Sequence, residues 1–334
     1  MKSEFALKFF GYLFSIFFLY LAFKDTDINL IYKNIEYLNF PYIFIAFFLT
    51  ILFFFIRSLY QQNNLQYISQ ELSFNISLQS IALTHFYNNI LPARLGEIIR
   101  AFYLSKKNNI GKTKILSYIL VEKIIDVIFT FILLLIIIII ETNAIEVVNK
   151  IKILPSLLFF LLICIAIFLY FNKYIAEKFR TIIPVKYHKK LSKINFDIRQ
   201  GLNCFKTSSQ VIKSIILLLV GWALVISIYY FISIPYIEIM LLPSYAFIYF
   251  LVFTALSLMI PSAPAGIGVV HYGLFFSVSL LNPDIVNSNI DLVAASIISL
   301  HFYIFFIDIL SSGLIILYQR INGNFRERIE QLKK

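Results

Sequence analysis

The residues of this sequence that can do chemistry stand beside Pro and Gly within otherwise apolar stretches. The first stretch is interrupted at residues 88–97, Asn-Asn-Ile-Leu-Pro-Ala-Arg-Leu-Gly-Glu. Guanidinium groups bind phosphate oxygens through paired donors, and a helix that begins after Pro92 points free N–H groups toward the same place. The segment therefore predicts an anion-binding site; the alternative is that its arginines merely flank a membrane helix at the cytoplasmic surface. The candidate binding residues are Asn88, Asn89, Arg94, Glu97 and Arg100.

A second interruption occurs at residues 261–268, Pro-Ser-Ala-Pro-Ala-Gly-Ile-Gly, and a histidine follows it. Pro removes a backbone donor and Gly frees the backbone, so a helix is expected to stop there. Unwound backbone inside a bilayer is tolerated only where it faces a cavity or other protein. The segment is therefore predicted to line a polar cavity. Its candidate substrate-binding residues are Pro261, Pro264, Gly266, Gly268 and His271.

A third charged cluster lies in a long apolar stretch. Glu122 and Asp126 are four residues apart on one predicted helix face, where Lys123 can neutralise Asp126. These acids are expected to pair with the arginines of the first interruption and to hold it in place. The alternative is that the three residues pair among themselves near the cytoplasmic interface.

Two ionisable residues occupy the last apolar stretch. His301 and Asp308 are seven residues apart, and so lie roughly on one helix face. Because His titrates near neutral pH, one interpretation is a proton relay with His271, although histidines with a purely structural role are more common. The alternative is that both histidines are purely structural.

The composition places these residues in a membrane protein. Hydrophobic residues make up 60% of the 334 residues and charged residues only 14%, whereas soluble domains average about 45–50% and about 25%. This excludes a soluble enzyme and a disordered chain. The net charge of +11 falls in the connections between apolar runs, where it indicates topology and not a nucleic-acid partner.

The predicted fold is an all-α polytopic membrane protein with six full transmembrane helices and two re-entrant helical hairpins. The hairpins at 76–104 and 244–281 contain the two interruptions. If they are instead ordinary spans with polar kinks, the chain crosses the membrane eight times. The six full spans are expected at about residues 5–23, 42–60, 115–140, 153–171, 211–233 and 292–318.

Basic residues concentrate in 94–114, in 172–210 and in the C-terminal tail, which predicts that both termini are cytoplasmic. The first hairpin then enters from the inside and the second from the outside. The halves, about 1–140 and 153–320, therefore form an inverted repeat within a single membrane domain, a pattern typical of transporters with a site near the bilayer midplane. Segment 172–210 is predicted to be a basic amphipathic helix on the inner leaflet; the alternative is a basic loop without lipid specificity.

The motifs resemble those of a known family, the lysylphosphatidylglycerol synthase transmembrane region, also called the flippase-like domain family. Asn89-x-x-Pro92-x-Arg94-x-Gly96-Glu97-x-x-Arg100 is similar to its first motif. The segment Glu122-Lys123-x-x-Asp126 resembles its Glu-Arg-x-x-Asp element, and residues 261–269 resemble its second Pro/Gly motif. His271 and His301 stand near positions where the family has Glu and Arg, so an ion pair there is not carried over. The resemblance implies movement of a polar lipid headgroup between leaflets.

The predicted function is a lipid transporter of the flippase type in the cell membrane, moving a polar or anionic headgroup through a midplane cavity. Its expected partners are membrane phospholipids or a lipid-linked headgroup. No metal is predicted, since HExxH and Cys–His spacings are missing from the sequence, and no cofactor is predicted. No enzyme activity is predicted, since the sequence offers no donor-binding loop. One alternative is a membrane-embedded transferase with Glu97, Glu122 or Asp126 as base. The other is an accessory membrane subunit of a lipid- or glycan-modifying enzyme.

Overall fold

A computed structural model describes residues 13, 16–24, 26, 27, 29, 40–66, 72–140, 192, 196 and 207–332 of the chain. The chain divides into two compact units, one made of residues 1–112 and 204–334 and the other of residues 113–203. Every regular element in the described residues is a helix, as predicted. The predicted span at 153–171 and most of the basic segment 172–210 lie outside the described residues.

Four helical stretches in the described residues are long and apolar enough to cross a membrane: Phe40–Leu65, Ser208–Ile239, Pro264–Leu281 and Ile290–Asn322. Three of them coincide with the spans predicted at 42–60, 211–233 and 292–318, and the other falls in the second predicted hairpin. These helices indicate a multi-pass membrane protein. The count of six spans and two re-entrant hairpins stays a prediction.

The first interruption breaks the chain into two helices that pack against each other. α4 (Phe74–Ile90) begins after Ser73, whose hydroxyl accepts a hydrogen bond from the Ile76 N–H at 3.3 Å. A single 3-10 turn, η1 (Pro92–Arg94), follows, and in it Ala93 and Arg94 have φ angles of 56° and 54°. α5 (Gly96–Asn108) then packs along α4. The chain thus breaks at Pro92, as its sequence predicts.

The second interruption produces the same arrangement. α11 (Ala246–Ser257) is followed by the 3-10 turn η3 (Pro264–Gly266) and by α12 (Val269–Leu281), and α12 packs along α11. Within the break, Ala265, Gly266 and Gly268 have φ angles of 58°, 74° and 92°. Such angles are open to Gly at little cost, which explains two glycines at this point.

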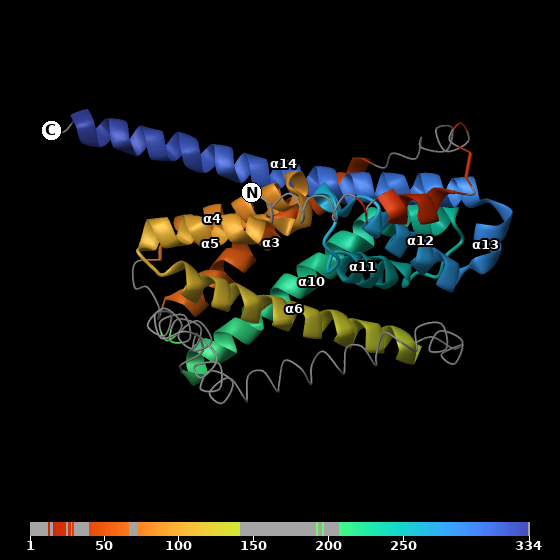
Figure 1. Ribbon diagram of the computed structural model, residues 1–334, viewed down its shortest axis with the longest axis horizontal. Coiled ribbons are helices and arrows are strands. Elements are labelled where there is room, and N and C mark those ends of the chain that lie inside the picture. The colour runs from red at the N-terminus through yellow and green to blue at the C-terminus, as the bar shows by residue number, and fades with distance from the viewer. Residues whose placement is uncertain are drawn as a thin grey trace, which may run out of the picture. The chain divides into compact units, whose positions relative to one another are not determined.

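The tips of the two hairpins meet within the first unit (Figure 1). The Ala93 N–H of η1 donates to the Ser262 carbonyl at 2.8 Å, and Arg94 Nη1 donates to the Leu258 carbonyl at 3.3 Å. A helix break leaves N–H and C=O groups without helical partners, and a buried unpaired group costs about as much as a lost hydrogen bond. Each break therefore supplies partners for the other.

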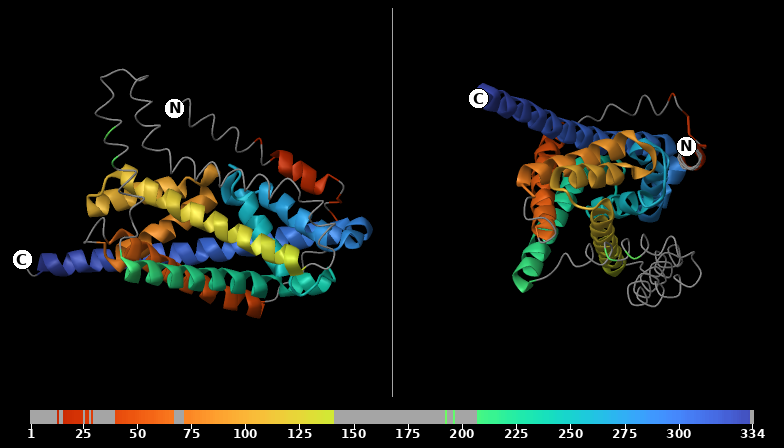
Figure 2. Two further views of the ribbon diagram at one scale, coloured as in Figure 1. Left: turned by 90° about the horizontal axis from the view of Figure 1, so that it is seen from below. Right: turned by 60° about the vertical axis from the view of Figure 1, so that its left-hand side comes forward.

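Long helices hold the two hairpins. α3 (Phe40–Leu65) lies side by side with α10 (Ser208–Ile239), as Figure 2 shows. α14 (Ile290–Leu332) packs against α3, α4 and α12, and the short α13 (Pro283–Ser288) joins it to the second hairpin. In the described residues, each half runs in chain order through a long helix, a broken pair and a long helix, and the inverted repeat stays a prediction.

The second unit contains α6 (Lys112–Ile140), a continuous helix of 29 residues that covers the span predicted at 115–140. Within it, Lys123 Nζ lies 3.9 Å from Asp126 Oδ2, so these two residues of the predicted cluster do pair. The expected pairing of Glu122 or Asp126 with the arginines of the first hairpin would join the two units and stays a prediction.

A glycine allows the arms of each hairpin to approach closely. A Cβ atom on Gly96 of α5 would overlap the Thr84 carbonyl oxygen of α4. A Cβ atom on Gly273 of α12 would lie 2.9 Å from the Phe253 carbonyl oxygen of α11. By contrast, a Cβ atom on Gly313 of α14 would meet its nearest neighbour at 3.7 Å, an ordinary contact.

The substitution Gly96→Ala is therefore expected to destabilise the protein by about 1–3 kcal/mol, because the added methyl group forces α5 away from α4. Gly313→Ala is the matched control and should be neutral or stabilising by up to about 1 kcal/mol, since Ala favours a helix over Gly. Unfolding of both variants in detergent, followed by circular dichroism, measures the difference. Equal stability of the two variants would contradict the close approach.

Candidate substrate cavity

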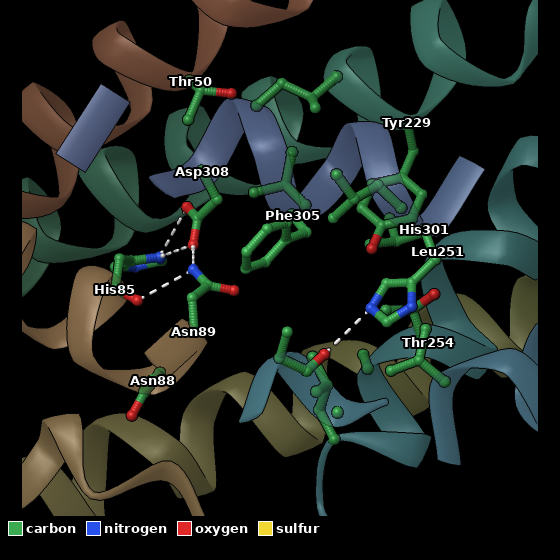
Figure 3. Close-up of a pocket in the computed structure, with 18 of the residues that line it drawn as sticks. Thr50, His85, Asn88, Asn89, Tyr229, Leu251, Thr254, His301, Phe305 and Asp308 are labelled. Carbon is green, nitrogen blue, oxygen red and sulfur yellow. Dashed lines mark hydrogen bonds and ion pairs between the residues drawn. The ribbon is translucent and has the colours of Figure 1, made fainter. Parts of the chain in front are cut away.

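A cavity of about 280 Å³ lies in the first unit, where the hairpin tips meet α3, α10 and α14 (Figure 3). Apolar side chains such as Phe53, Ile228 and Leu251 make much of its wall. Apolar walls with a few converging polar groups are typical of ligand sites. The polar and charged side chains that line it are Thr50, His85, Asn88, Asn89, Arg94, Trp222, Tyr229, Thr254, His301 and Asp308.

The cavity collects only part of the predicted site. Of the candidate residues, it is lined by Asn88, Asn89, Arg94, Gly266, His301 and Asp308. Its lining does not include Glu97, Arg100, Pro261, Pro264, Gly268 or His271. Pro261 is exposed and Pro264 is half-buried in the second break. Pro261 follows the end of α11 by four residues, and Pro264 is the first residue of η3.

One polar cluster in the cavity joins α4 to α14 (Figure 3). The Asp308 carboxylate lies 3.0 and 3.3 Å from His85 Nδ1, and it accepts a hydrogen bond of 2.6 Å from Asn89 Nδ2. Asn89 Nδ2 also donates to the His85 carbonyl at 3.0 Å. A carboxylate removed from water needs such partners. Asp308 was expected to act with His301, but its hydrogen bonds go to α4.

Arg94 lines the cavity from the first hairpin tip. Its side chain is half-buried, and its one hydrogen bond is the 3.3 Å contact with the Leu258 carbonyl. No carboxylate in the described residues forms an ion pair with it. A guanidinium carries five N–H donors. Arg94 therefore retains donors and an unbalanced positive charge at the cavity wall.

Asn88 contributes to the start of α5. Its Oδ1 accepts a hydrogen bond of 2.9 Å from the Gly96 N–H, one of the donors that the sequence offered to an anion. This donor is thus already bonded within the protein. A ligand would therefore bind the Arg94 side chain more readily than the N-terminus of α5.

Arg100 lies in the protein interior, 1% exposed. Its Nε donates to Gln61 Oε1 of α3 at 2.6 Å, and Gln61 Nε2 donates in turn to the hydroxyls of Ser77 and Ser80 of α4 at 2.8 and 2.7 Å. Arg100 Nη1 also lies 3.9 Å from Glu97 Oε2. These bonds tie α5 to α3 and α4, so Arg100 fixes the hairpin that carries Arg94.

Two histidines form a chain of hydrogen bonds at the second break. The Gly268 N–H donates to His271 Nδ1 at 3.2 Å, His271 Nε2 lies 3.3 Å from His301 Nδ1, and His301 Nε2 lies 3.0 Å from the Ala265 carbonyl. A carbonyl only accepts and a backbone N–H only donates. Both rings must therefore carry their proton on Nε2, and both are neutral in this arrangement.

The sequence analysis missed His85. It lies three and four residues before Asn88 and Asn89, a spacing that places all three on one helix face, and this was the available signal. His85 is also packed against Phe54, with ring centroids 4.7 Å apart. Within the described parts of the chain, no group of three or more His, Cys, Asp or Glu side chains is arranged to hold a metal ion.

Comparisons with known proteins agree with the motif resemblance. The family model described as the lysylphosphatidylglycerol synthase TM region matches residues 8–310. The UPF0104 membrane protein MJ1078 of Methanocaldococcus jannaschii is 30% identical over 209 residues, which is 60% of this chain and 81% of the relative. No solved structure matches the chain.

The hydrogen bonds of Asp308 with α4 predict an energetic coupling between Asp308 and His85. Asp308→Leu and His85→Leu should each destabilise by about 1–3 kcal/mol, because each leaves a half-buried polar partner without its bond. The double variant should lose less than the sum, with a coupling of about 0.5–3 kcal/mol. Denaturant unfolding of the four proteins gives this value.

A control cycle pairs His85→Leu with Ser288→Ala, an exposed residue of α13. These two changes should be additive. Additivity of the Asp308 and His85 changes as well would rule out the contact.

Proposed function

The chain belongs to the lysylphosphatidylglycerol synthase transmembrane-region family, and from this membership and the cavity we propose that it is a lipid transporter of the flippase type. It moves a polar or anionic headgroup between leaflets while the acyl chains stay in the lipid. Arg94 carries the proposal, because it is a cation without an ion pair in the described residues at the wall of a largely apolar cavity.

The lengths of the hairpin arms support a re-entrant arrangement. α5 and α12 have 13 residues each, and at about 1.5 Å per residue each is about 20 Å long. The hydrocarbon core of a bilayer is about 30 Å thick. The stretch Pro264–Leu281 reaches a spanning length only if η3 is counted with α12, although Gly268 breaks it with a φ of 92°. Two hairpins joined tip to tip are long enough to reach from both faces.

The size and the lining of the cavity suit a phospholipid headgroup. A volume of about 280 Å³ accommodates a headgroup but not two acyl chains as well. A phosphate needs charge-assisted donors, which Arg94 supplies. Asn88, Thr50 and Tyr229 add groups that can bond the rest of the headgroup. The apolar wall faces the part of the lipid where the chains begin.

The hairpin contact also supports transport by alternating access. The two tips share the hydrogen bonds from Ala93 to Ser262 and from Arg94 to Leu258. Breaking so few bonds costs little if a headgroup or water replaces the partners. We propose that one repeat half moves against the other about these tips, with both termini cytoplasmic in the cell membrane.

The test uses purified protein in liposomes that contain fluorescent phosphatidylglycerol, with dithionite to quench the outer leaflet. Wild type should accelerate exchange between leaflets. Arg94→Ala should slow it about 10- to 100-fold, because it loses charge-assisted bonds worth about 1.5–3 kcal/mol. Arg94→Lys should recover only part of the rate, since Lys lacks the planar fork.

The matched control is Arg320→Ala, which removes an exposed arginine of α14 and should leave the rate unchanged. Absence of accelerated exchange in wild type, with phosphatidylglycerol and with phosphatidylethanolamine, would refute the flippase proposal. Chemical conversion of a lipid-linked donor by the same protein would favour the transferase alternative.

A further inference from the structure

We propose that the His271–His301 pair is a proton-binding site and that one proton is taken up there in each transport cycle. The inference rests on the proposed transport function but concerns a different part of the molecule from Arg94. It gives the transporter a proton as second ligand. The hydrogen-bond chain at the second break, its place in the hairpin tip and its access to the cavity carry the argument.

In the observed arrangement, the chain of hydrogen bonds through the two histidines cannot accept an additional proton. The only unprotonated ring nitrogens, Nδ1 of His271 and Nδ1 of His301, both accept hydrogen bonds, at 3.2 and 3.3 Å. A proton on His301 Nδ1 would face the N–H of His271, and a proton on His271 Nδ1 would face the N–H of Gly268. Two donors then point at each other. Proton uptake must therefore break the chain at one of these two bonds.

Breaking this chain of hydrogen bonds weakens the contact between the two hairpins. The bonded backbone groups, the Ala265 carbonyl and the Gly268 N–H, belong to the second break, and Ala265 lies in η3 itself. The same break supplies the Ser262 carbonyl that accepts from Ala93 of the first hairpin. A protonated pair thus loosens the segment that holds the two tips together. The observed structure corresponds to the unprotonated, closed tip.

A proton can reach the pair from the cavity. His301 lines the cavity, whereas His271 lies behind it, 8% exposed, with the Phe23 ring 5.5 Å from its own. The two rings touch edge to face, with centroids 4.6 Å apart. His301 is therefore the entry point and His271 the inner member of the pair.

Three other ionisable groups on the cavity wall already have hydrogen-bond partners. His85 of α4 and Asp308 of α14 bond each other at 3.0 Å, and Arg94 of η1 bonds the Leu258 carbonyl. Tyr229 of α10 adds a hydroxyl. Beside the pair itself, Tyr303 follows His301 by two residues on α14, and Tyr272 of α12 packs on Phe18. His85 is the other histidine that lines the cavity besides His301, and it provides the control.

The transport experiment measures leaflet exchange in liposomes with equal pH on both sides. Because burial disfavours the charged form of the pair, proton uptake should limit the cycle near neutral pH, and the wild-type rate should rise at least about tenfold as the pH falls from 8 to 5.5. His301→Gln and His271→Gln should remove this dependence, since the amide stays neutral. His85→Gln should retain the ratio of the two rates, whatever its absolute rate.

A second measurement does not need transport. Protein labelled with ¹⁵N at histidine, in detergent, should show His271 and His301 as Nε2–H tautomers at pH 8, assigned by loss of signals in the two Gln variants. Lowering the pH should convert signals of the pair to the imidazolium form. This result stands even if no lipid moves, and so separates failure of the proton site from failure of the proposed function.

The inference is overturned if wild-type exchange is independent of pH, or if His301→Gln keeps the wild-type pH dependence. It is also overturned if His85→Gln alone removes the dependence, which would place the proton at His85 and Asp308. Where wild type moves no lipid, imidazole signals of the pair that stay neutral down to pH 5 overturn it.

Discussion

The structure depends on how two broken helices satisfy their backbone hydrogen bonds in an apolar medium. α4 ends two residues before Pro92 and α11 ends four residues before Pro261, so each break leaves backbone groups without helical partners. The protein brings the two breaks together, so that Ala93 bonds the Ser262 carbonyl across the contact. The cavity lies beside this contact, and its largely apolar wall includes Arg94 of the first tip and Ala265 and Gly266 of the second.

Buried polar side chains fix each hairpin to the helices around it. On the first hairpin, Arg100 and Gln61 link α5 to α3 and α4, while on the second the two histidines bridge the break to α14. A further set joins α3 to α10, where Asn63 Nδ2 donates to Ser214 Oγ at 2.8 Å and Gln210 Nε2 donates to the Asn63 carbonyl at 2.9 Å. These bonds are strong away from water, and they fix the helices that position Arg94.

The two proposals concern different halves of one contact. Arg94 lies on the first tip and is proposed to bind the ligand, whereas the histidine pair lies at the second tip and is proposed to control how firmly that tip is closed. Ligand and proton would thus both act on the few hydrogen bonds between the tips. The proposed transport requires this contact to open, and the hydrogen bonds from Ala93 to Ser262 and from Arg94 to Leu258 would then have to break.

The sequence by itself determined the membrane class, the helix breaks at both Pro/Gly segments and the family, because composition, proline geometry and local motifs do not depend on distant contacts. It also named half of the polar residues that line the cavity, namely Asn88, Asn89, Arg94, His301 and Asp308. It did not determine their partners: His85 was missed, Asp308 bonds α4 and not His301, and Arg100 is buried against Gln61. Those pairings depend on which helix faces meet, as when α14 packs against α4. Only the tertiary structure decides this, since the paired residues are separated by up to 223 positions in the chain.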